Sequence, residues 1–282
     1  MAHTIHNQRG QIVLITLLVL AIATTIALSL ISRTTNDASI TRQVEESSRA
    51  FSAAEAGIEE ALRTQSGSNG VVTLAAGVSY SVNVSSIGNA VGLYELPKKT
   101  LQGNTETVWL VNHAADGSIV ESPTYTAPSI SVCWSKKSAT EIPALVATLM
   151  YKQSGVYKTV KTAIDPDGVR SASNNFSNTY SSGGCGGSVA TDYKATITFS
   201  ALNATITPAI DTLIMLRIRP VYYDTSMVID SGVSVLPLQG IRIESTGSTI
   251  GGTNRKIVVY QQYRSPSTIF DAALYSENTL NK

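Results

Sequence analysis

An uncharged run of 22 residues, from Gln11 to Ser32, follows directly after Arg9 and Gly10. As a helix it would measure about 33 Å, and the hydrocarbon core of a bilayer is about 30 Å thick. Thr and Ser are scattered along the run and form no polar stripe, which the core helix of a soluble protein should have. The run is also too long for the apolar region of a cleaved secretory signal. We therefore expect a membrane span at 11–32.

The charges near the span predict its orientation. Arg9 lies on the short side with His3 and His6, so the first ten residues should stay in the cytoplasm. Arg33 and Arg42 lie on the other side, but acidic residues accompany them. The bulk of the chain is therefore expected outside the cytoplasm. The net charge is +1, and Lys and Arg are dispersed without a basic stripe, so we expect no nucleic-acid partner.

The helical pattern continues beyond the span. From Arg33 to Arg63 there is no proline, and apolar residues recur at spacings of three, four and seven. We interpret these residues as one packing face, formed by Ile40, Val44, Phe51, Ala54, Ile58 and Leu62. A single helix over 11–64 would be about 80 Å long, and Gly67 and Gly70 are expected to supply the left-handed positions that end it. Small residues within Phe51–Leu62 would let a sheet or another helix approach closely.

After Gly70 the apolar pattern changes to a period of two, which is typical of strands. The strand-like stretches are Val78–Ser86, Thr107–Asn112, Ser129–Ser135, Tyr193–Ser200, Asp211–Tyr223 and Arg255–Tyr263, with a hairpin around Ser154 and Gly155. About nine to twelve short strands without a second helical block favour a sandwich or a curled sheet. Residues 171–188 are expected to form a long loop. The predicted fold class is α+β, a long N-terminal helix followed by one β-rich, sandwich-like head over 65–282.

The chain has two cysteines, Cys133 in a predicted strand and Cys185 in the flexible stretch SSGGCGGS. An oxidising compartment permits one bridge between them, and the alternative is two unpaired buried thiols. A bridge would close a loop of about 50 residues and stabilise the fold by up to about 4 kcal/mol.

Residues suited to catalysis or metal binding are sparse. His113 is the one histidine beyond the first ten residues, so a zinc site built on histidines is excluded there. Asp116, three residues away, belongs to an Asp-Gly turn rather than to a catalytic triad. The stretch DPDG at Asp165–Gly168 lacks the further oxygen ligands of a calcium loop, and we read it as a turn. We expect no enzymatic activity, no metal and no cofactor.

The two ends of the chain carry a resemblance. A short polar leader ending in Gly10, an uncharged run, and a long helix with AAEAGIEEAL resemble a prepilin with a class III signal, and within that group the PilX-type minor pilins. The stretches LPLQGIRIESTGSTIGGTNRKIVVYQQY and SPSTIFDAALYSE are similar to the end of such proteins, where a strand with a Ser-Thr-Gly turn, a basic strand and an FD.AL.S close recur. The resemblance covers 1–64 closely and the segment from Leu236 more loosely.

The resemblance implies a leader at 1–10 that a prepilin peptidase removes by cutting between Gly10 and Gln11. The mature chain would wait in the cytoplasmic membrane as a single-pass protein until an assembly platform moves it into a surface filament. Gln11 departs from the usual Phe or Met, and Ile15 stands at the fifth mature position, where most pilins have Glu. That carboxylate would pair with the amino terminus of a neighbouring subunit.

The resemblance thus predicts a non-enzymatic minor pilin of a type IV pilus or a related secretion filament. It would prime or cap a filament built from the major and other minor pilins and display its head for adhesion. The alternative is a bitopic surface protein whose uncleaved signal anchor displays a β-sandwich that binds a ligand or the cell wall. The pilin loses its first ten residues and the anchor keeps them.

Overall fold

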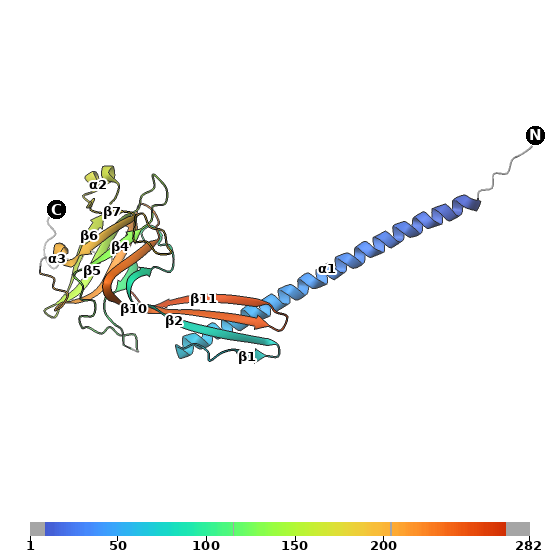
Figure 1. The fold of residues 1–282 in the computed structure, drawn as a ribbon, viewed down its shortest axis with the longest axis horizontal. Helices are drawn as coiled ribbons and strands as arrows, with labels where there is room; N and C mark the ends of the chain where they lie inside the picture. The colour runs from blue at the N-terminus through green and yellow to red at the C-terminus, as the bar shows by residue number, and fades with distance from the viewer. Residues whose placement is uncertain (1–8, 115, 204, 269–282) are drawn as a thin grey trace, which may run out of the picture. The chain divides into compact units, whose positions relative to one another are not determined.

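The structure is a computed structural model that describes residues 9–114, 116–203 and 205–268. Its helices are α1 (Arg9–Thr64), α2 (Gly168–Asn174) and α3 (Phe199–Leu202) (Figure 1). Its strands are β1 (Val72–Ala75), β2 (Val78–Glu95), β3 (Glu106–Trp109), β4 (Ser129–Trp134), β5 (Ala144–Gln153), β6 (Val156–Ile164), β7 (Ser181–Ser182), β8 (Tyr193–Thr198), β9 (Thr212–Val221), β10 (Met227–Thr249) and β11 (Asn254–Gln262). The predicted α+β class is confirmed, because a long apolar N-terminal helix precedes antiparallel sheets.

The chain divides into two compact units. The helix unit contains the chain up to Val84 together with Ile243–Val259, and the head unit contains Ser85–Arg242 and the segment from Tyr260 onward. The boundary expected at residue 65 therefore differs from the division that the structure shows. The long strands β2 and β10 both pass from one unit into the other, so the residues that pair beside α1 belong with the helix.

Helix α1 is unbroken over 56 residues because no proline interrupts Arg9–Thr64. It ends at Gln65, which adopts a left-handed conformation with φ of 54° and donates its backbone N–H to the carbonyl of Ala61 at 2.8 Å. The expectation that Gly67 supplies a left-handed position is wrong, although Gly70 does have a φ of 88°. Gly67 instead lies close to β2, where an added Cβ would come 2.8 Å from the carbonyl oxygen of Val82.

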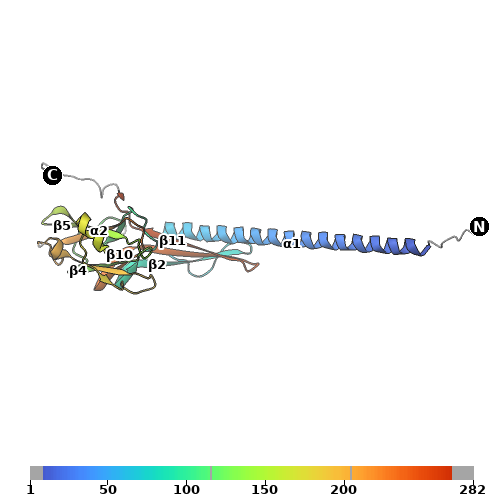
Figure 2. The ribbon, with the colours of Figure 1, turned by 90° about the horizontal axis from the view of Figure 1, so that it is seen from above.

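The sheet of the helix unit lies along the C-terminal half of α1 (Figure 2). In it β1 pairs antiparallel with β2, β2 neighbours β10, and β11 pairs with the end of β10. The turn between β10 and β11 is closed by the backbone bonds from Thr249 N to Thr253 O and from Gly252 N to Thr249 O, both 3.0 Å. The resemblance placed a turn at Ser245-Thr246-Gly247, but these residues lie inside β10.

The head unit contains a four-stranded antiparallel sheet in the order β3-β9-β5-β6. Strands β5 and β6 form the predicted hairpin, and Ser154 and Gly155 both have positive φ, as a two-residue turn that matches strand twist requires. On a second sheet β4 lies between β10 and β8, with Met227 opposite Trp134 and Tyr193 opposite the same tryptophan on the other side. The alternating patterns thus predicted most of these strands.

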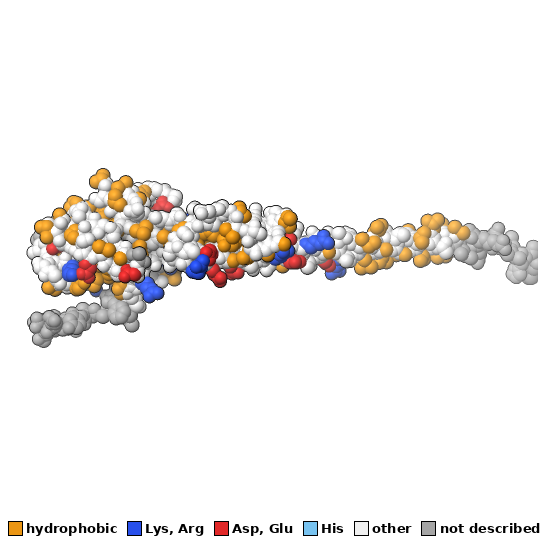
Figure 3. All heavy atoms as spheres, turned by 90° about the horizontal axis from the view of Figure 1, so that it is seen from below, with side chains coloured by type: hydrophobic (Ala, Val, Ile, Leu, Met, Phe, Trp, Pro, Cys, Tyr) orange, Lys and Arg blue, Asp and Glu red, His pale blue; other side chains and the backbone are white. Residues whose placement is uncertain are grey.

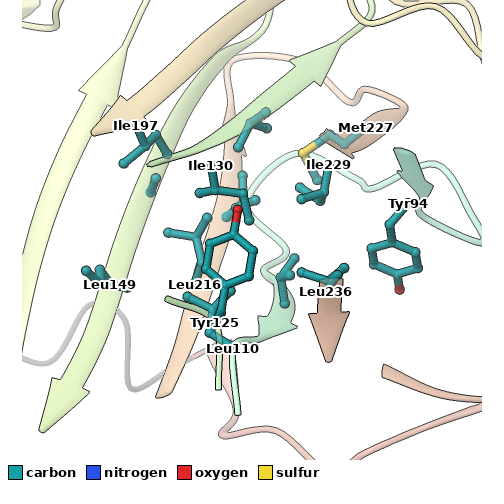
Figure 4. Packing of buried hydrophobic residues seen from close by; sticks show 14 of the residues in the cluster. Tyr94, Leu110, Tyr125, Ile130, Leu149, Ile197, Leu216, Met227, Ile229 and Leu236 are labelled. Carbon is teal, nitrogen blue, oxygen red and sulfur yellow. The ribbon is translucent and has the colours of Figure 1, made fainter. Parts of the chain in front are cut away.

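Alternate side chains of both sheets of the head unit share one hydrophobic core. Figure 4 shows Tyr125 among Leu110, Ile130 and Leu216, all of which are buried. The hydroxyl of Tyr125 remains satisfied because it donates to the carbonyl of Ser129 at 2.9 Å.

The segment expected as a long loop at 171–188 contains regular structure. Asp167 caps α2, and its Oδ1 accepts the backbone N–H groups of Val169 and Arg170 at 3.0 and 3.1 Å. Asn175 closes this helix in a left-handed conformation, and β7 follows. The Ser- and Asn-rich composition concealed the helix, because these residues favour caps and turns as much as helix interiors.

Candidate functional site

The first half of α1 carries exposed apolar side chains in every direction. Its large side chains from Val13 to Ile31 are between 51 and 68% exposed, and no part of this stretch is buried within the protein. On the face seen in Figure 3, the stretch from Val13 to Ile31 carries no charged side chain. Among the described residues, α1 is the one helix that is long and apolar enough to cross a membrane.

The threonine hydroxyl groups of this stretch are satisfied within the helix. Thr16, Thr24 and Thr25 each donate to a backbone carbonyl three or four residues earlier, at 2.8 to 3.0 Å. Such bonds remove the need for water at each hydroxyl. The threonines scattered along the run are therefore compatible with a hydrocarbon environment.

Gly10 and Gln11, where the resemblance predicts cleavage, lie in the first turn of α1. The side chain of Gln11 falls outside the described part of the structure, as do residues 1–8 of the expected leader. The cleavage site therefore stays a prediction.

The helix face that packs within the chain differs from the predicted one. Of the six expected packing residues, Ala54 and Ile58 are buried, whereas Ile40, Val44, Phe51 and Leu62 are exposed. The buried face consists of small residues and one isoleucine: Ala50, Ala53, Ala54, Gly57, Ile58 and Ala61. At about 100° per residue, its centre is roughly 80° around the helix from the predicted stripe. The expected single stripe is thus two features, a buried small-residue face and an exposed apolar line formed by Ile40, Val44, Phe51 and Leu62.

The small-residue face brings α1 unusually near to the sheet. A Cβ added to Gly57 would come 2.3 Å from Ser245 Oγ and 2.8 Å from side-chain atoms of Tyr80 and Val82. A Cβ added to Gly247 would come 1.9 Å from the carbonyl oxygen of Ala50. At each of the two positions an added Cβ would come too close to its neighbours. The close approach of helix and sheet therefore requires glycine at both positions.

Polar bonding contributes little at this contact. Within the described residues, Ser245 Oγ, Thr249 Oγ1 and Glu46 Oε2 are buried and have no hydrogen-bond partner. A buried polar atom without a partner costs about 1–3 kcal/mol. Side-chain bonds to α1 lie at the margin of the contact, where Arg255 Nε of β11 donates to Ser47 Oγ at 2.8 Å, so the centre of the contact is held by close packing of small residues.

Cys133 and Cys185 form a disulfide in the head unit, with Cα atoms 5.8 Å apart. Glu95 holds the same loop from β2, because its carboxylate accepts the backbone N–H groups of Ser188 and Val189 at 2.7 and 3.2 Å. The hydroxyl of Ser188, together with these backbone bonds, lowers the pKa of Glu95 against the opposing effect of burial. The glycine-rich stretch around Cys185 is thus fixed at two points.

His113 packs against two aromatic rings. Its ring stacks on Tyr263 with centroids 3.8 Å apart and meets the edge of Trp109 at 4.6 Å. Burial lowers its pKa, and Nδ1 has no hydrogen-bond partner within the described chain. Asp116 Oδ1 accepts instead from the backbone N–H and hydroxyl of Ser118. The structure therefore gives His113 a packing role and does not bring Asp116 to it as a triad partner.

Asp165 of the DPDG stretch is fully buried and is occupied by protein groups. Its two oxygens accept from Arg170 Nε at 2.7 Å and Nη2 at 2.8 Å, and Asn174 Nδ2 donates at 2.8 Å. The guanidinium of Arg170 also stacks on Tyr222, 4.0 Å from the ring centroid. The carboxylate of Asp165 orders the turn before α2. Among the described residues, no group of three or more His, Cys, Asp or Glu side chains could hold a metal ion.

The partner of the small-residue face was not predicted from the sequence, because Gly247 inside β10 was interpreted as part of a turn. The available signal was the spacing of three and four between Ala50, Ala53, Gly57 and Ala61, which places small residues on one side of a helix.

We found no protein-family model, no curated protein and no solved structure that matches this chain.

Proposed function

We propose that the protein is a non-enzymatic minor pilin of a type IV pilus or a related secretion filament. The observation that carries the proposal is the division of α1 into three surfaces. Its first half is apolar and exposed all round, its second half has a small-residue face under the sheet, and a separate exposed apolar line continues through Ile40, Val44, Phe51 and Leu62.

A signal anchor needs only the first of these surfaces. Beyond the bilayer, these four side chains are 39 to 64% exposed, so on a rigid helix in water each forgoes part of the about 1.5–3 kcal/mol that full burial is worth. Helices of neighbouring subunits would bury this line in a filament. The line therefore favours the pilin over the bitopic surface protein, in which nothing would cover it.

The orientation and the partners follow from the proposal. The first ten residues face the cytoplasm, where a prepilin peptidase cuts between Gly10 and Gln11, and the head lies outside. The mature helix waits in the cytoplasmic membrane, and an assembly platform moves it among the major and other minor pilins. Ile15 supplies no carboxylate for a neighbour's amino terminus, and an unpaired charge in an apolar filament core costs several kcal/mol. We therefore place this subunit at a filament end, where it primes or caps assembly.

We further propose that the head unit packs as a β-sandwich and serves adhesion. The support for the packing is the single core to which both sheets of the unit contribute, for example Leu149 and Leu216 from one sheet and Ile130 and Ile197 from the other. Inner faces that interdigitate in this way are typical of sandwiches.

The intact mass of the membrane-extracted protein tests the proposal. We expect wild-type protein to lack residues 1–10, and we expect Gly10→Val to keep them, because a side chain at the cleavage position should block the close approach of the peptidase. Gly168→Ala lies far from the site, needs no positive φ and would bring its Cβ no closer than 3.7 Å to another residue, so it serves as the control. Wild-type protein that retains its first ten residues would support the signal-anchored alternative and contradict the pilin.

A further inference from the structure

A hollow of about 580 Å³ lies on the outer face of the β3-β9-β5-β6 sheet of the head unit. Its floor contains Trp109 of β3, Met150 of β5, and Ile214 and Met215 of β9. Its volume is in the range of small-molecule sites, whereas a second depression on the same sheet, beside Thr148, has about 10 Å³ and holds no more than a water molecule. The hollow is therefore large enough for a ligand.

A β-bulge produces the apolar floor. Met150 lies opposite Met215, but the next residue of β5, Tyr151, lies opposite Leu213, so Ile214 is the extra residue of β9. Ile214 and Met215 therefore belong to one small apolar cluster, whereas Leu213 belongs to the main core. In a regular strand, successive side chains point to opposite faces. The bulge thus adds a second apolar side chain of β9 to the floor.

The backbone of the floor is occupied by hydrogen bonds within the protein. Strand β9 lies between β3 and β5, and β5 lies between β9 and β6, so neither strand has a free edge. At Trp109 the side-chain amide of Gln239 accepts from the backbone N–H and donates to the backbone carbonyl, both at 2.8 Å. A polypeptide that binds by strand addition needs unpaired backbone groups. The floor therefore suits a ligand without a row of amide groups.

The charges at the rim favour an anionic ligand. Glu121 is already paired, since its carboxylate binds Lys152 and accepts from the hydroxyl of Tyr157. Arg264 also lines the hollow, is exposed, and has no ion pair within the described residues. Among the lining residues that the structure describes, Arg264 thus carries the free charge. A guanidinium binds a carboxylate through two parallel hydrogen bonds.

We infer that the hollow binds a small amphiphile, an acyl chain that ends in a carboxylate. The chain lies on the apolar floor, and the carboxylate lies beside Arg264. Methionine side chains such as Met150 and Met215 adapt their shape to irregular apolar ligands, so the floor accepts a flexible chain. The apolar floor and the free guanidinium together match a ligand with one apolar end and one anionic end. The inference does not depend on the proposed function, because it uses the head unit alone.

Quenching of tryptophan fluorescence tests where the ligand binds. The full chain is placed in phosphatidylcholine vesicles, and the probe is decanoate brominated at the end of its chain, because bromine quenches tryptophan at short range. The chain has two tryptophans, Trp109 in the floor and Trp134, which is fully buried in the main core. We expect saturable quenching in wild-type protein and none in Trp109→Phe, in which an unchanged emission spectrum of Trp134 shows that the head is folded. Quenching that never saturates, or that is as strong in Trp109→Phe, would overturn the inference.

A matched pair of ligands tests the contact with Arg264. Arg264→Gln changes an exposed side chain and should weaken binding of the brominated decanoate by up to about fivefold, the range of an exposed ion pair. The affinity for the brominated decanol should stay unchanged, because the alcohol carries no charge. Lys98→Gln removes an equal charge from an exposed residue outside the lining and is the control, with no change for either ligand. Unchanged affinity for the acid in Arg264→Gln, equal weakening for acid and alcohol, or equal weakening in Lys98→Gln would overturn the inference.

Discussion

Gly247 of β10 lies directly against the backbone of α1 at Ala50. A Cβ at Gly247 would come 1.9 Å from the carbonyl oxygen of Ala50 and 2.6 Å from the backbone nitrogen of Ala54. Neither atom belongs to a side chain that could move aside. Helix and strand therefore meet backbone to backbone, and this contact fixes the C-terminal half of α1 on its sheet.

Gly247→Ala should destabilise the helix unit by about 1–3 kcal/mol or more, because overpacking forces the backbone to shift. Ser245→Ala changes the same face of the same strand and is the matched control. It removes a buried hydroxyl without a partner, so it should be neutral or stabilising. Hydrogen exchange of β10 amides in detergent-extracted protein measures both effects. Equal protection in the two variants would show that the close contact is unimportant.

Periodicity predicted the elements better than it predicted their contacts. The 3.6-residue pattern identified a helix and the alternating pattern identified strands, because each depends on neighbours within the element. The pattern ranked Ile40 and Phe51 as packing residues because they are large and apolar. Within the chain it is Ala50 and Gly57 that pack, and the separate expectation that small residues within Phe51–Leu62 let a sheet approach closely is confirmed. Which face meets which partner is decided by residues far apart in the sequence.

The same limit applies to the head unit. Cys133 and Cys185 were recognised as a candidate pair because there are only two cysteines. The hollow on the outer face was missed because it requires a bulge at Ile214 and the proximity of β3, β5 and β9, which are far apart in sequence. The alternating pattern did not identify β10, because Pro237 and Gly240 interrupt it and a local pattern reads such residues as turns, and only the resemblance placed a strand in its second half.

The disulfide between Cys133 and Cys185 should be present in protein taken from the cell envelope. Alkylation of the denatured, unreduced protein should label neither cysteine, and two labelled cysteines would contradict the bond. Replacing both by alanine should lower the stability of the head unit by about 2–4 kcal/mol, because the bond closes a separation of 52 residues.

Stability of the head unit should depend on the ionised form of Asp165. Burial by itself raises the pKa of this carboxyl, but the bonds from Arg170, Asp167 N and Asn174 lower it overall. A group whose pKa is lower in the folded state stabilises the protein above its unfolded pKa, about 3.9, and loses this contribution as the pH falls through the folded value. Asp165→Asn should therefore flatten the loss of stability below pH 4.

Arg170→Met tests the ion pair between Arg170 and Asp165 at neutral pH. The substitution leaves the buried carboxylate of Asp165 without its partner, so it should lower the free energy of unfolding by about 3–5 kcal/mol. Lys136→Met breaks an ion pair with the partly exposed Asp192 and is the control, with an expected cost below about 1 kcal/mol. Urea unfolding followed by tryptophan fluorescence measures both. Similar costs for the two variants would contradict the role of Asp165.

The exposed apolar line on α1 should matter for assembly and not for folding. Phe51→Ser should change the stability of the isolated protein by less than about 0.5 kcal/mol, since its side chain is exposed. Ile58→Ala, on the buried face, should cost about 2–5 kcal/mol. In cells, Phe51→Ser should reduce recovery of the protein with filaments while its amount in the membrane stays constant. Unchanged recovery would show that the line has another partner.

The most direct test of the account is quantitative mass spectrometry of sheared, purified filaments, combined with gold labelling of the head. We predict that the protein is present in the filaments at far lower abundance than the main subunit and that the label lies near filament tips. This result follows from Ile15, which cannot neutralise a neighbour's amino terminus at every repeat. Absence of the protein from the filaments would contradict its assignment as a pilin. Abundance equal to the main subunit, with label along the whole shaft, would contradict its place at a filament end.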